Sequence, residues 1–518
     1  MHIQPRVGVL VFFIVILGAC SSRTALTTGG IATGPHVAAT NNPQVALYKL
    51  TLSSDANVVV QFGRDTNYGL TTSRQPIPAG GGTVSILVAG MRAFTIYHMR
   101  AVVNFSDGSQ SVDTDQVFTT GGLPDSQLPD FTITQPAGLT PQPGIEMLDL
   151  VGSQPNVMAV DLSGNVIWYY TFQGTAADVV QPIKPLPNGR FLVEISPTSS
   201  ILTNGNGSPP AGTITTIREI DLAGTTIREI SLDTLNSRLA TAGFNIVGST
   251  LHHDVLPLPN GHWIVMTNTT RQFAQFGDTN VLGDVLVDLD TNMQPVWVWS
   301  TFDHLDVNRR PMGFPDWTHS NALLYSPDDG NLLLSMRHQN WIVKINYANG
   351  SGAGDVIWRL GSGGDFVLQG GTDPTNWFYA QHGPSFTTSQ TAGKFSMVVF
   401  DNGNGRKFPP TDPCTTMPTP ACQFSTVPIL EIDEVNKIAS LDFDDDPVPF
   451  SFFGGYSQLL ANGNIEFDEC ATAALPPTAD IFEVVEEPSP RTVWHMNISG
   501  KFAYRAFRLP SLYPGVQW

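Results

Sequence analysis

One β-hairpin pattern decides the fold of this chain, and its clearest copy is Pro257-Leu258-Pro259-Asn260-Gly261-His262-Trp263-Ile264-Val265. An apolar strand ends in a Pro-Asn-Gly turn and a second apolar strand follows it, which is a strong hairpin signal. The pattern recurs, in full or in part, at residues 185–193, 325–334 and 459–465. Its turn glycines are Gly189, Gly261, Gly330, Gly393 and Gly463, which lie 63 to 72 residues apart. The chain is therefore built from a repeat.

Each repeat has room for a second hairpin, which often ends on a strand that carries tryptophan, as at Trp168, Trp297, Trp358 and Trp494. Four strands per unit and about six units predict an all-β fold, a six-bladed β-propeller over residues 145–518 whose closed ring protects its strand edges. The first unit, near residues 145–172, is the least regular. A stacked β-solenoid and several separate sandwiches are the alternatives. The long period and the paired hairpins favour the propeller.

The residues before the propeller divide into shorter segments. Alternating apolar strands over residues 42–121 predict a small β-sandwich that resembles a fibronectin type III domain. Residues 122–144 are rich in Pro and Gly and are expected to be a linker, and residues 21–41 a flexible tether. Arg6 and the apolar run that follows it, too short to cross a bilayer, predict a signal peptide over residues 1–20.

The positions of the cysteines indicate that the protein is exported. Leu17-Gly18-Ala19-Cys20 resembles the lipobox of bacterial lipoproteins. This resemblance implies that Cys20 is lipidated and that the protein is an exported, membrane-anchored lipoprotein facing the periplasm or the cell exterior. An ordinary signal peptide is the alternative, and it also implies export. Cys414 and Cys422 flank a Pro-rich loop and could form a disulfide in an oxidising compartment, which leaves Cys470 unpaired.

The net charge argues against one class of partner, and the distribution of histidine indicates where the functional site lies. The chain has 26 basic and 45 acidic residues, a net charge of −19, and it has no basic stripe. Nucleic acid is therefore excluded as a partner. Seven of the eleven histidines lie between His252 and His382. Three of them, His253, His319 and His382, each stand shortly before an apolar strand and its turn, at equivalent positions of the repeat.

The repeat predicts that these histidines converge at the mouth of the propeller channel, which the innermost strand of each blade lines. His252 or His253, His319 with Asn321, and His382 precede or begin such strands. Adjacent residues of a strand point in opposite directions, so only one of His252 and His253 is expected to face the channel. We favour His253.

Arg337 completes this set of residues. It begins the loop after the second strand of its blade, so a local excursion of the chain has to bring it to the histidines. A guanidinium offers paired donors, imidazoles donate or attack, and an amide donates without charge, which together suit a tetrahedral oxyanion. A neutral imidazole is also a competent nucleophile near pH 7.

Three motifs resemble the bacterial arylsulfotransferase family. They are His252-His253-Asp254 before a Leu-Pro-Asn-Gly turn, Asp316-Trp317-Thr318-His319-Ser320-Asn321 with Arg337-His338-Gln339 downstream, and Gln381-His382. The resemblance covers about residues 144–494 and implies a six-bladed propeller. It implies transfer of a sulfuryl group from an aryl sulfate to a phenol, with no nucleotide donor, no metal and no cofactor. The oligomeric state stays open between a monomer and a homodimer.

The resemblance also implies residue roles. His382 would be the nucleophile that is transiently sulfated in a ping-pong mechanism. His253, His319 and Arg337 would be the other catalytic residues, which bind and polarise the sulfuryl oxygens. The substrate-binding residues would be His252, Asn321 and Asp254, with Asp254 as an orienting partner.

Two other functions stay open. A metal-dependent hydrolase or lyase would hold a divalent ion with His253, Asp254, His319 and His382. A non-catalytic surface lipoprotein would bind a glycan or a protein through the propeller. Arg337 argues against the metal, because a permanent cation repels a metal ion and attracts sulfate. Four histidines are expected to have structural roles, namely His262, His304, His338 and His495, and residues 401–406 stay open between a tight turn and a wall of the site.

Overall fold

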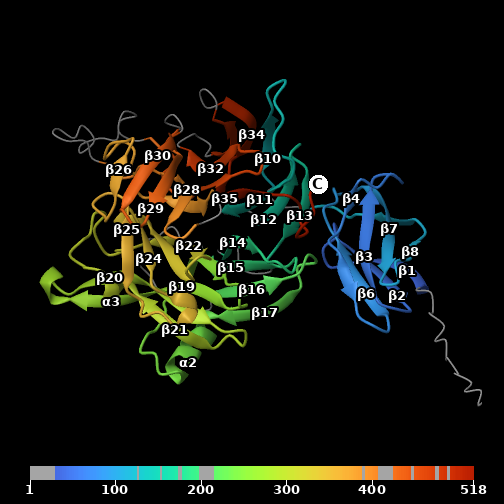
Figure 1. The fold of residues 1–518 in the computed structure, drawn as a ribbon, viewed down its shortest axis with the longest axis horizontal. Helices are drawn as coiled ribbons and strands as arrows, with labels where there is room; N and C mark the ends of the chain where they lie inside the picture. Colours follow the sequence, from blue (N-terminus) through green and yellow to red (C-terminus); the bar gives the residue numbers. More distant parts are fainter. Residues whose placement is uncertain are drawn as a thin grey trace, which may run out of the picture.

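The chain folds into a small β-sandwich and a large ring of β-sheets, which lie side by side in the computed structural model (Figure 1). The structure describes residues 30–124, 128–151, 155–172, 178–197, 215–387, 391–406, 424–444, 449–472, 478–486 and 491–518. The predicted signal peptide, Cys20, Cys414 and Cys422 lie outside these residues. The prediction of an all-β chain is confirmed.

The sandwich consists of two sheets that share one core. The strands of the first are β1 (Ile31–Ala39), β2 (Ala46–Leu52) and β6 (Gly82–Val88); those of the second are β3 (Ala56–Gly63), β4 (Leu70–Thr71), β5 (Gln75–Ile77), β7 (Ile96–Phe105), β8 (Gln110–Val112) and β9 (Gln116–Thr119). Buried and less buried residues alternate along β2 and β3, as expected for strands with one face in a core.

The sandwich begins earlier than the sequence predicted. Residues 21–41 were expected to be a tether, but β1 pairs antiparallel with β2. Ile31 and Val37 pack against the core of the sandwich, which gives this edge strand an apolar face. Its Gly and Thr content concealed that face in the sequence.

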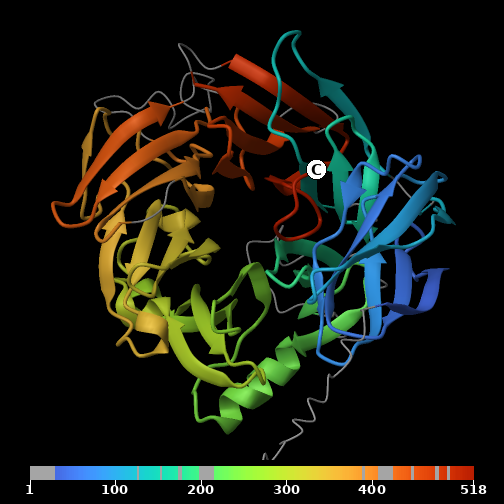
Figure 2. The same ribbon diagram turned by 45° about the vertical axis from the view of Figure 1, so that its right-hand side comes forward.

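The remaining strands form six sheets of four or five strands in the described residues. Figure 2 shows these sheets arranged around a common centre, as the blades of a propeller. The strands of each sheet are given from the innermost outward. The first two sheets consist of β35 (Phe502–Leu509), β11 (Ile145–Val151), β12 (Val157–Asp161) and β13 (Val166–Tyr170), and of β14 (Asp178–Pro185), β15 (Phe191–Pro197), β16 (Thr216–Ile220) and β17 (Thr226–Ser231). The third and fourth consist of β18 (Leu251–Pro257), β19 (Trp263–Phe273), β20 (Thr279–Leu289) and β21 (Pro295–Ser300), and of β22 (Ser320–Ser326), β23 (Asn331–Met336), β24 (Trp341–Ile345) and β25 (Val356–Leu360). The fifth and sixth consist of β27 (His382–Phe386), β28 (Lys394–Phe400), β29 (Pro428–Asp433), β30 (Ile438–Asp444) and β26 (Val367–Gln369), and of β31 (Tyr456–Leu459), β32 (Ile465–Thr472), β33 (Thr478–Val485), β34 (Arg491–Ser499) and β10 (Asp130–Thr134).

Both ends of the propeller sequence close the ring. The last strand, β35, is the innermost strand of the first sheet and pairs with β11. The first unit looked irregular in the sequence because its inner strand comes from the other end of the chain. The expected linker over residues 122–144 is also different, since β10 lies within it and pairs with β34. Phe131 and Ile133 of β10 pack against the core between the first and last sheets.

The features that revealed the repeat have structural roles. All five turn glycines have positive φ angles between 72° and 88°, a conformation that favours glycine, and each turn joins the first and second strands of its sheet. Four tryptophans are buried, namely Trp168, Trp299, Trp358 and Trp494. The indole N–H of each donates to an acceptor in a neighbouring sheet. That acceptor lies in a turn, except for Trp299, whose acceptor lies just before the outer strand β25. These tryptophans therefore join blade to blade.

Two short helices, α2 (Leu232–Thr241) and α3 (Thr301–His304), are inserted between blades. No helix in the described part of the chain is long and apolar enough to cross a bilayer. The sandwich is held to the propeller by Arg92, which pairs with Asp161 at 2.6 Å, and by Tyr513, whose hydroxyl donates to the carbonyl of Leu87.

Candidate active site

Three innermost strands deliver the histidines that the repeat pointed to. His252 and His253 lie in β18, His319 directly precedes β22, and His382 is the first residue of β27. These strands are neighbours around the ring centre. The pairing register of each is interrupted near its histidine. Such irregularities re-aim side chains and are frequent beside active sites.

His252 and His253 both turn into the site, so the expectation that only one of them would do so is wrong. Their Nδ1 atoms lie 2.9 Å apart, and the ring of His253 is 4.7 Å from that of His319. His253 has a φ of 63°, which breaks the alternation of an extended strand. His319 has a φ of 46°. Left-handed conformations are costly for histidine, and their occurrence at two neighbouring imidazoles is typical of a functional site.

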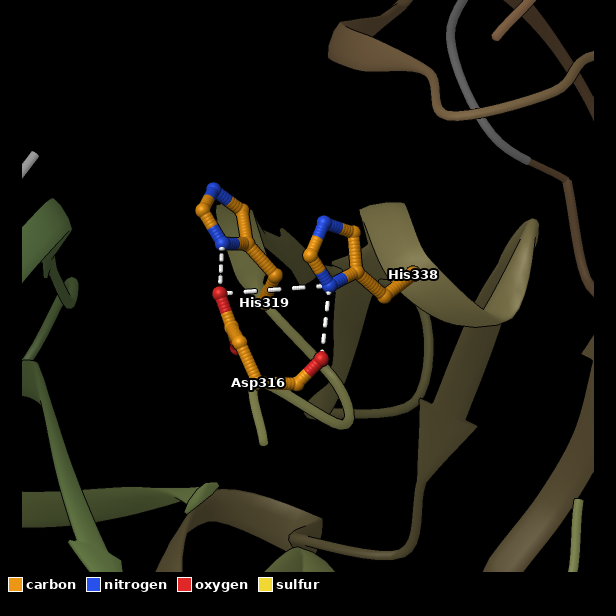
Figure 3. A group of neighbouring side chains, drawn as sticks. All are labelled: Asp316, His319 and His338. Carbon is orange, nitrogen blue, oxygen red and sulfur yellow. Dashed lines mark hydrogen bonds and ion pairs between the residues drawn. The ribbon is translucent and has the colours of Figure 1, made fainter. Parts of the chain in front are cut away.

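His319 and His338 stand side by side above Asp316 (Figure 3). Their rings are stacked with centroids 4.5 Å apart. The carboxylate of Asp316 bonds Nδ1 of His319, which fixes the proton there and leaves the Nε2 lone pair free to react. We expect a structural role for His338, and the structure places it beside His319 and Arg337 with both ring nitrogens hydrogen-bonded.

Asp316, His319 and His338 form the one group in the described residues whose side chains lie close enough together to hold a metal ion. The donor set does not fit one. Nδ1 of His338 donates to the main-chain oxygen of Asp316 at 2.8 Å, and its Nε2 accepts from Nη1 of Arg337 at 2.7 Å. Both ring nitrogens are therefore occupied, and a permanent cation lies beside the group.

Arg337 reaches the site through a 3-10 turn, η2 (Arg337–Gln339), which directly follows β23. Its main-chain N–H donates to the carbonyl of His319 at 3.1 Å, which fixes the turn against the site. One guanidinium nitrogen contacts His338 and another donates to the carbonyl of Phe452 at 3.1 Å. Nε is buried and has no partner in the described residues. Arg337 thus keeps donor capacity for an anion.

His382 is held in one tautomer by Asn402. Nδ1 of His382 lies 2.6 Å from Oδ1 of Asn402. The amide nitrogen of Asn402 donates to the carbonyls of Ser451 and Gly454, so only its oxygen can face the ring. Nδ1 therefore carries the proton, and Nε2 presents a lone pair, which among the described residues receives only a long contact of 3.4 Å from the N–H of Gly454. This is the tautomer that a nucleophilic imidazole needs.

The loop that carries Asn402 is part of the site wall, which decides between the two readings of residues 401–406. Asp401 is buried, forms an ion pair with Arg406 and accepts bonds from the N–H groups of Tyr379 and Gly403. These bonds hold the loop in place beneath Asn402.

Tyr504 completes the site from the opposite end of the sequence. It lies in β35, and its ring centroid is 6.0 Å from that of His253 and 6.1 Å from that of His382. Its hydroxyl is buried without a partner in the described residues. Burial raises the pKa of this phenol, so the group is neutral and able to donate at neutral pH. No motif in the sequence pointed to it.

Asp254 and Asn321, both predicted to bind substrate, have different surroundings. Asp254 is fully buried and faces Lys184 at 2.9 Å and Arg505 at 3.3 Å, so it does not line the site. Asn321 donates from Nδ2 to the carbonyl of Gln381 at 2.7 Å. This bond ties β22 to the residue before His382, and it leaves one amide hydrogen for a ligand.

The electrostatics of the site keep its imidazoles neutral. Burial and the neighbouring Arg337 hold the pKa of His382 well below its usual range. Burial and His319 do the same to the pKa of His253. Burial lowers the pKa of His319 and of His338 to about 3 in each case. A neutral imidazole has a free lone pair, and Arg337 is left as the principal cation facing it. The arrangement can therefore bind an oxyanion and attack it.

Solved structures with a similar arrangement of strands have very different sequences. They include a mutant of the apocarotenoid oxygenase of Synechocystis (10% identity, 93% of this chain and 97% of that chain, TM-score 0.32) and an ulvan lyase bound to its glycan (8%, 93% and 97%, 0.31). A third is the β-xylosidase RS223 (8%, 67% and 96%, 0.29). Likenesses this weak carry no argument about this chain. No curated protein matches it.

The family comparison is specific. A family model described as Arylsulfotransferase (ASST) matches residues 140–505. That span begins just before β11 and ends in β35, so it contains five of the six inner strands, the first half of β35, and each of His253, His319, Arg337 and His382. The prediction from the sequence motifs is confirmed: this chain belongs to the arylsulfotransferase family and is an enzyme.

Proposed function

We propose that the enzyme moves a sulfuryl group from an aryl sulfate to a phenol by two displacements through a sulfated His382. The observation that carries this proposal is the tautomer of His382, with Nδ1 bonded to Asn402 and the Nε2 lone pair left with a single long contact from the N–H of Gly454 in the described residues. The pKa of His382 lies well below its usual range because of burial and Arg337, so the lone pair is available at neutral pH. Covalent catalysis removes the need to bind both substrates together.

In the first displacement, Nε2 of His382 attacks the sulfur of the donor. An N–S bond forms, and the S–O bond to the aryl group breaks with its electron pair leaving on the phenolate. The proton on Nδ1 stays bonded to Asn402 and so supports the positive charge on the ring. Arg337 and its imidazole neighbours stabilise the sulfuryl oxygens, Tyr504 can donate a hydrogen bond to the leaving phenolate, and the phenolate takes its proton from solvent.

In the second displacement, a phenol enters in place of the first. Its hydroxyl proton passes to Nε2 of His319, which is free because Asp316 holds the proton on Nδ1, and His319 then releases this proton to solvent. The phenol oxygen forms a bond to sulfur, the N–S bond breaks, and its electrons return to Nε2 of His382. The product is a new aryl sulfate, and the imidazole is neutral again.

A reaction with the sulfate donor and no acceptor tests this proposal. We expect the enzyme mixed with 4-nitrophenyl sulfate, without acceptor, to release one equivalent of nitrophenol in a burst and to retain one sulfuryl group. Adding phenol should then discharge the label at once. Release that requires phenol in the same mixture, with no retained sulfuryl group, would indicate direct transfer between the two substrates and refute the covalent step.

We also propose that the protein is a lipoprotein anchored to a membrane through Cys20, on the strength of Leu17-Gly18-Ala19-Cys20. Cys20→Ser is expected to move the protein from the detergent-rich to the aqueous phase in detergent phase separation, because acyl chains supply the membrane affinity. Cys470→Ser is the matched control, since Cys470 is buried in the fold. Equal partitioning of Cys20→Ser and the unaltered protein would refute the lipid anchor.

A further inference from the structure

Arg505 is a buried cation directly beneath the catalytic strands. It lies in β35, next to Tyr504, and is 4% exposed. Its Nη2 donates to the carbonyl of Asn321 at 2.6 Å and to that of His253 at 3.3 Å. One side chain from the first sheet therefore binds the main chain of the inner strands of two other sheets, β18 and β22.

The contact with His253 acts on a strained peptide. His253 has a φ of 63°, the conformation that turns both His252 and His253 into the site. A guanidinium bond to its carbonyl stabilises that conformation, since a bond to a charged donor is stronger than one to a neutral donor. The same guanidinium fixes the carbonyl of Asn321, whose side chain leads to the residue before His382.

An ion pair with Asp254 fixes the position of Arg505 in turn. Asp254 accepts from Arg505 at 3.3 Å and from Lys184 at 2.9 Å, and its carboxylate also receives the N–H of Leu323 at 2.8 Å. This contact accounts for Asp254 in the His252-His253-Asp254 motif, where it holds Arg505 and not the substrate.

We propose that Arg505 is a positioning residue for sulfuryl transfer, which holds the peptides of His253 and Asn321 in place and supplies a second positive charge beneath the anion site. The proposal rests on the function proposed above for His382. Its charge joins that of Arg337 in opposing protonation of the neighbouring imidazoles. Burial is the main cause of the low pKa of His253 and of His382, and Arg505 contributes to both.

Two substitutions separate charge from geometry. Arg505→Gln removes the charge, and Arg505→Lys keeps it but cannot bond two carbonyls and a carboxylate in one fixed plane. Arg505 lines a cavity of about 300 Å³ together with Lys184 and Asp254, so a shorter side chain enlarges an existing cavity. Arg508→Gln is the matched control, because Arg508 is a buried arginine of the same strand that pairs with Glu146 and Glu483, away from the histidines.

We expect kcat/KM for 4-nitrophenyl sulfate to fall by about 100-fold in both Arg505 variants, the size of effect that a misplaced catalytic group produces. The pH profile should distinguish them. A nearby positive charge disfavours the imidazolium, so its removal raises the imidazole pKa. As the pH falls, activity should therefore be lost at a higher pH in Arg505→Gln than in the unaltered enzyme, and Arg505→Lys should keep the original acid limb.

The other groups around these imidazoles are unchanged in the variants. His382 is faced by Arg337, His319, Asn402 and Tyr504, and His253 by His252, His319, His382 and Tyr504. NMR titration of the histidine side chains gives a readout that does not depend on activity, and it should show the imidazoles of His253 and His382 titrating at higher pH in Arg505→Gln only.

The outcomes are separable. An unaltered enzyme that transfers no sulfuryl group refutes the proposed function, while the NMR titration still tests the role of Arg505. An Arg505→Gln variant with an unshifted acid limb and unshifted imidazoles overturns the proposal. Equal losses of kcat/KM in Arg505→Gln and Arg508→Gln, per folded molecule, also overturn it, since they would assign Arg505 a structural role alone. If Arg505→Gln does not fold, Arg505→Lys with unchanged kcat/KM overturns the proposal by itself.

Discussion

His382→Asn is expected to abolish both sulfuryl transfer and labelling by donor alone, with loss of the nitrophenol burst. Asparagine keeps a polar side chain of similar reach but offers no lone pair comparable to that of Nε2. Because Asn402 and the N–H of Gly454 surround the ring with polar groups, the substitution should leave the fold intact, as judged by circular dichroism and thermal unfolding. His262→Asn is the matched control, since His262 bonds Asp288 at a turn outside the site.

The chemistry of the label adds a second criterion. A sulfuryl group on imidazole nitrogen should be lost in acid and survive base better, in contrast to an O-sulfate on Ser or Tyr. Labelled protein recovered from His382→Asn would move the nucleophile to His253 or His319. Full transfer without any label would leave His382 as a binding residue only.

Arg337→Lys is expected to lower kcat by about 10²–10³, the loss typical of one oxyanion donor. Lysine keeps the charge, but its ammonium cannot bond His338, the carbonyl of Phe452 and a sulfuryl oxygen with one planar group. Single-turnover release of nitrophenol isolates the chemical step.

Arg309→Lys is the matched control for Arg337→Lys, because Arg309 bonds the neighbouring Gln339 carbonyl and stacks on Trp341 outside the histidine group. Its kcat should stay near that of the unaltered enzyme. A similar loss in both variants would mean that arginine in this region serves the loop and not the anion.

The repeat could be predicted because its signals are local. Asn-Gly turns, alternating strands and outer tryptophans each act over a few residues, and glycine at a positive-φ position is needed in every copy. The same regularity placed His253, His319 and His382 at the starts of inner strands, and the structure confirms these positions. Arg337 was predicted to need an excursion, and η2 provides it.

Other parts of the site depend on contacts between residues far apart in the sequence. The pairing of β35 with β11 joins the two ends of the propeller sequence, and this pairing brings Tyr504 and Arg505 to the histidines. No periodicity marks such a closing strand, because it interrupts the repeat. The strand β10 lies in the expected linker because its partner, β34, is more than 350 residues away in the sequence.

The sequence by itself determined the all-β repeat and the family, and it determined which imidazoles lie at equivalent positions, because both follow from local spacing. Only the tertiary structure decided the direction and the protonation of those side chains. A left-handed φ at His253 turns both adjacent histidines into the site, against the alternation of a regular strand. The amide of Asn402, oriented by two carbonyls of the next inner segment, selects the tautomer of His382. Direction and tautomer depend on backbone strain and on hydrogen-bond partners from other blades, and only the closed ring brings those partners together.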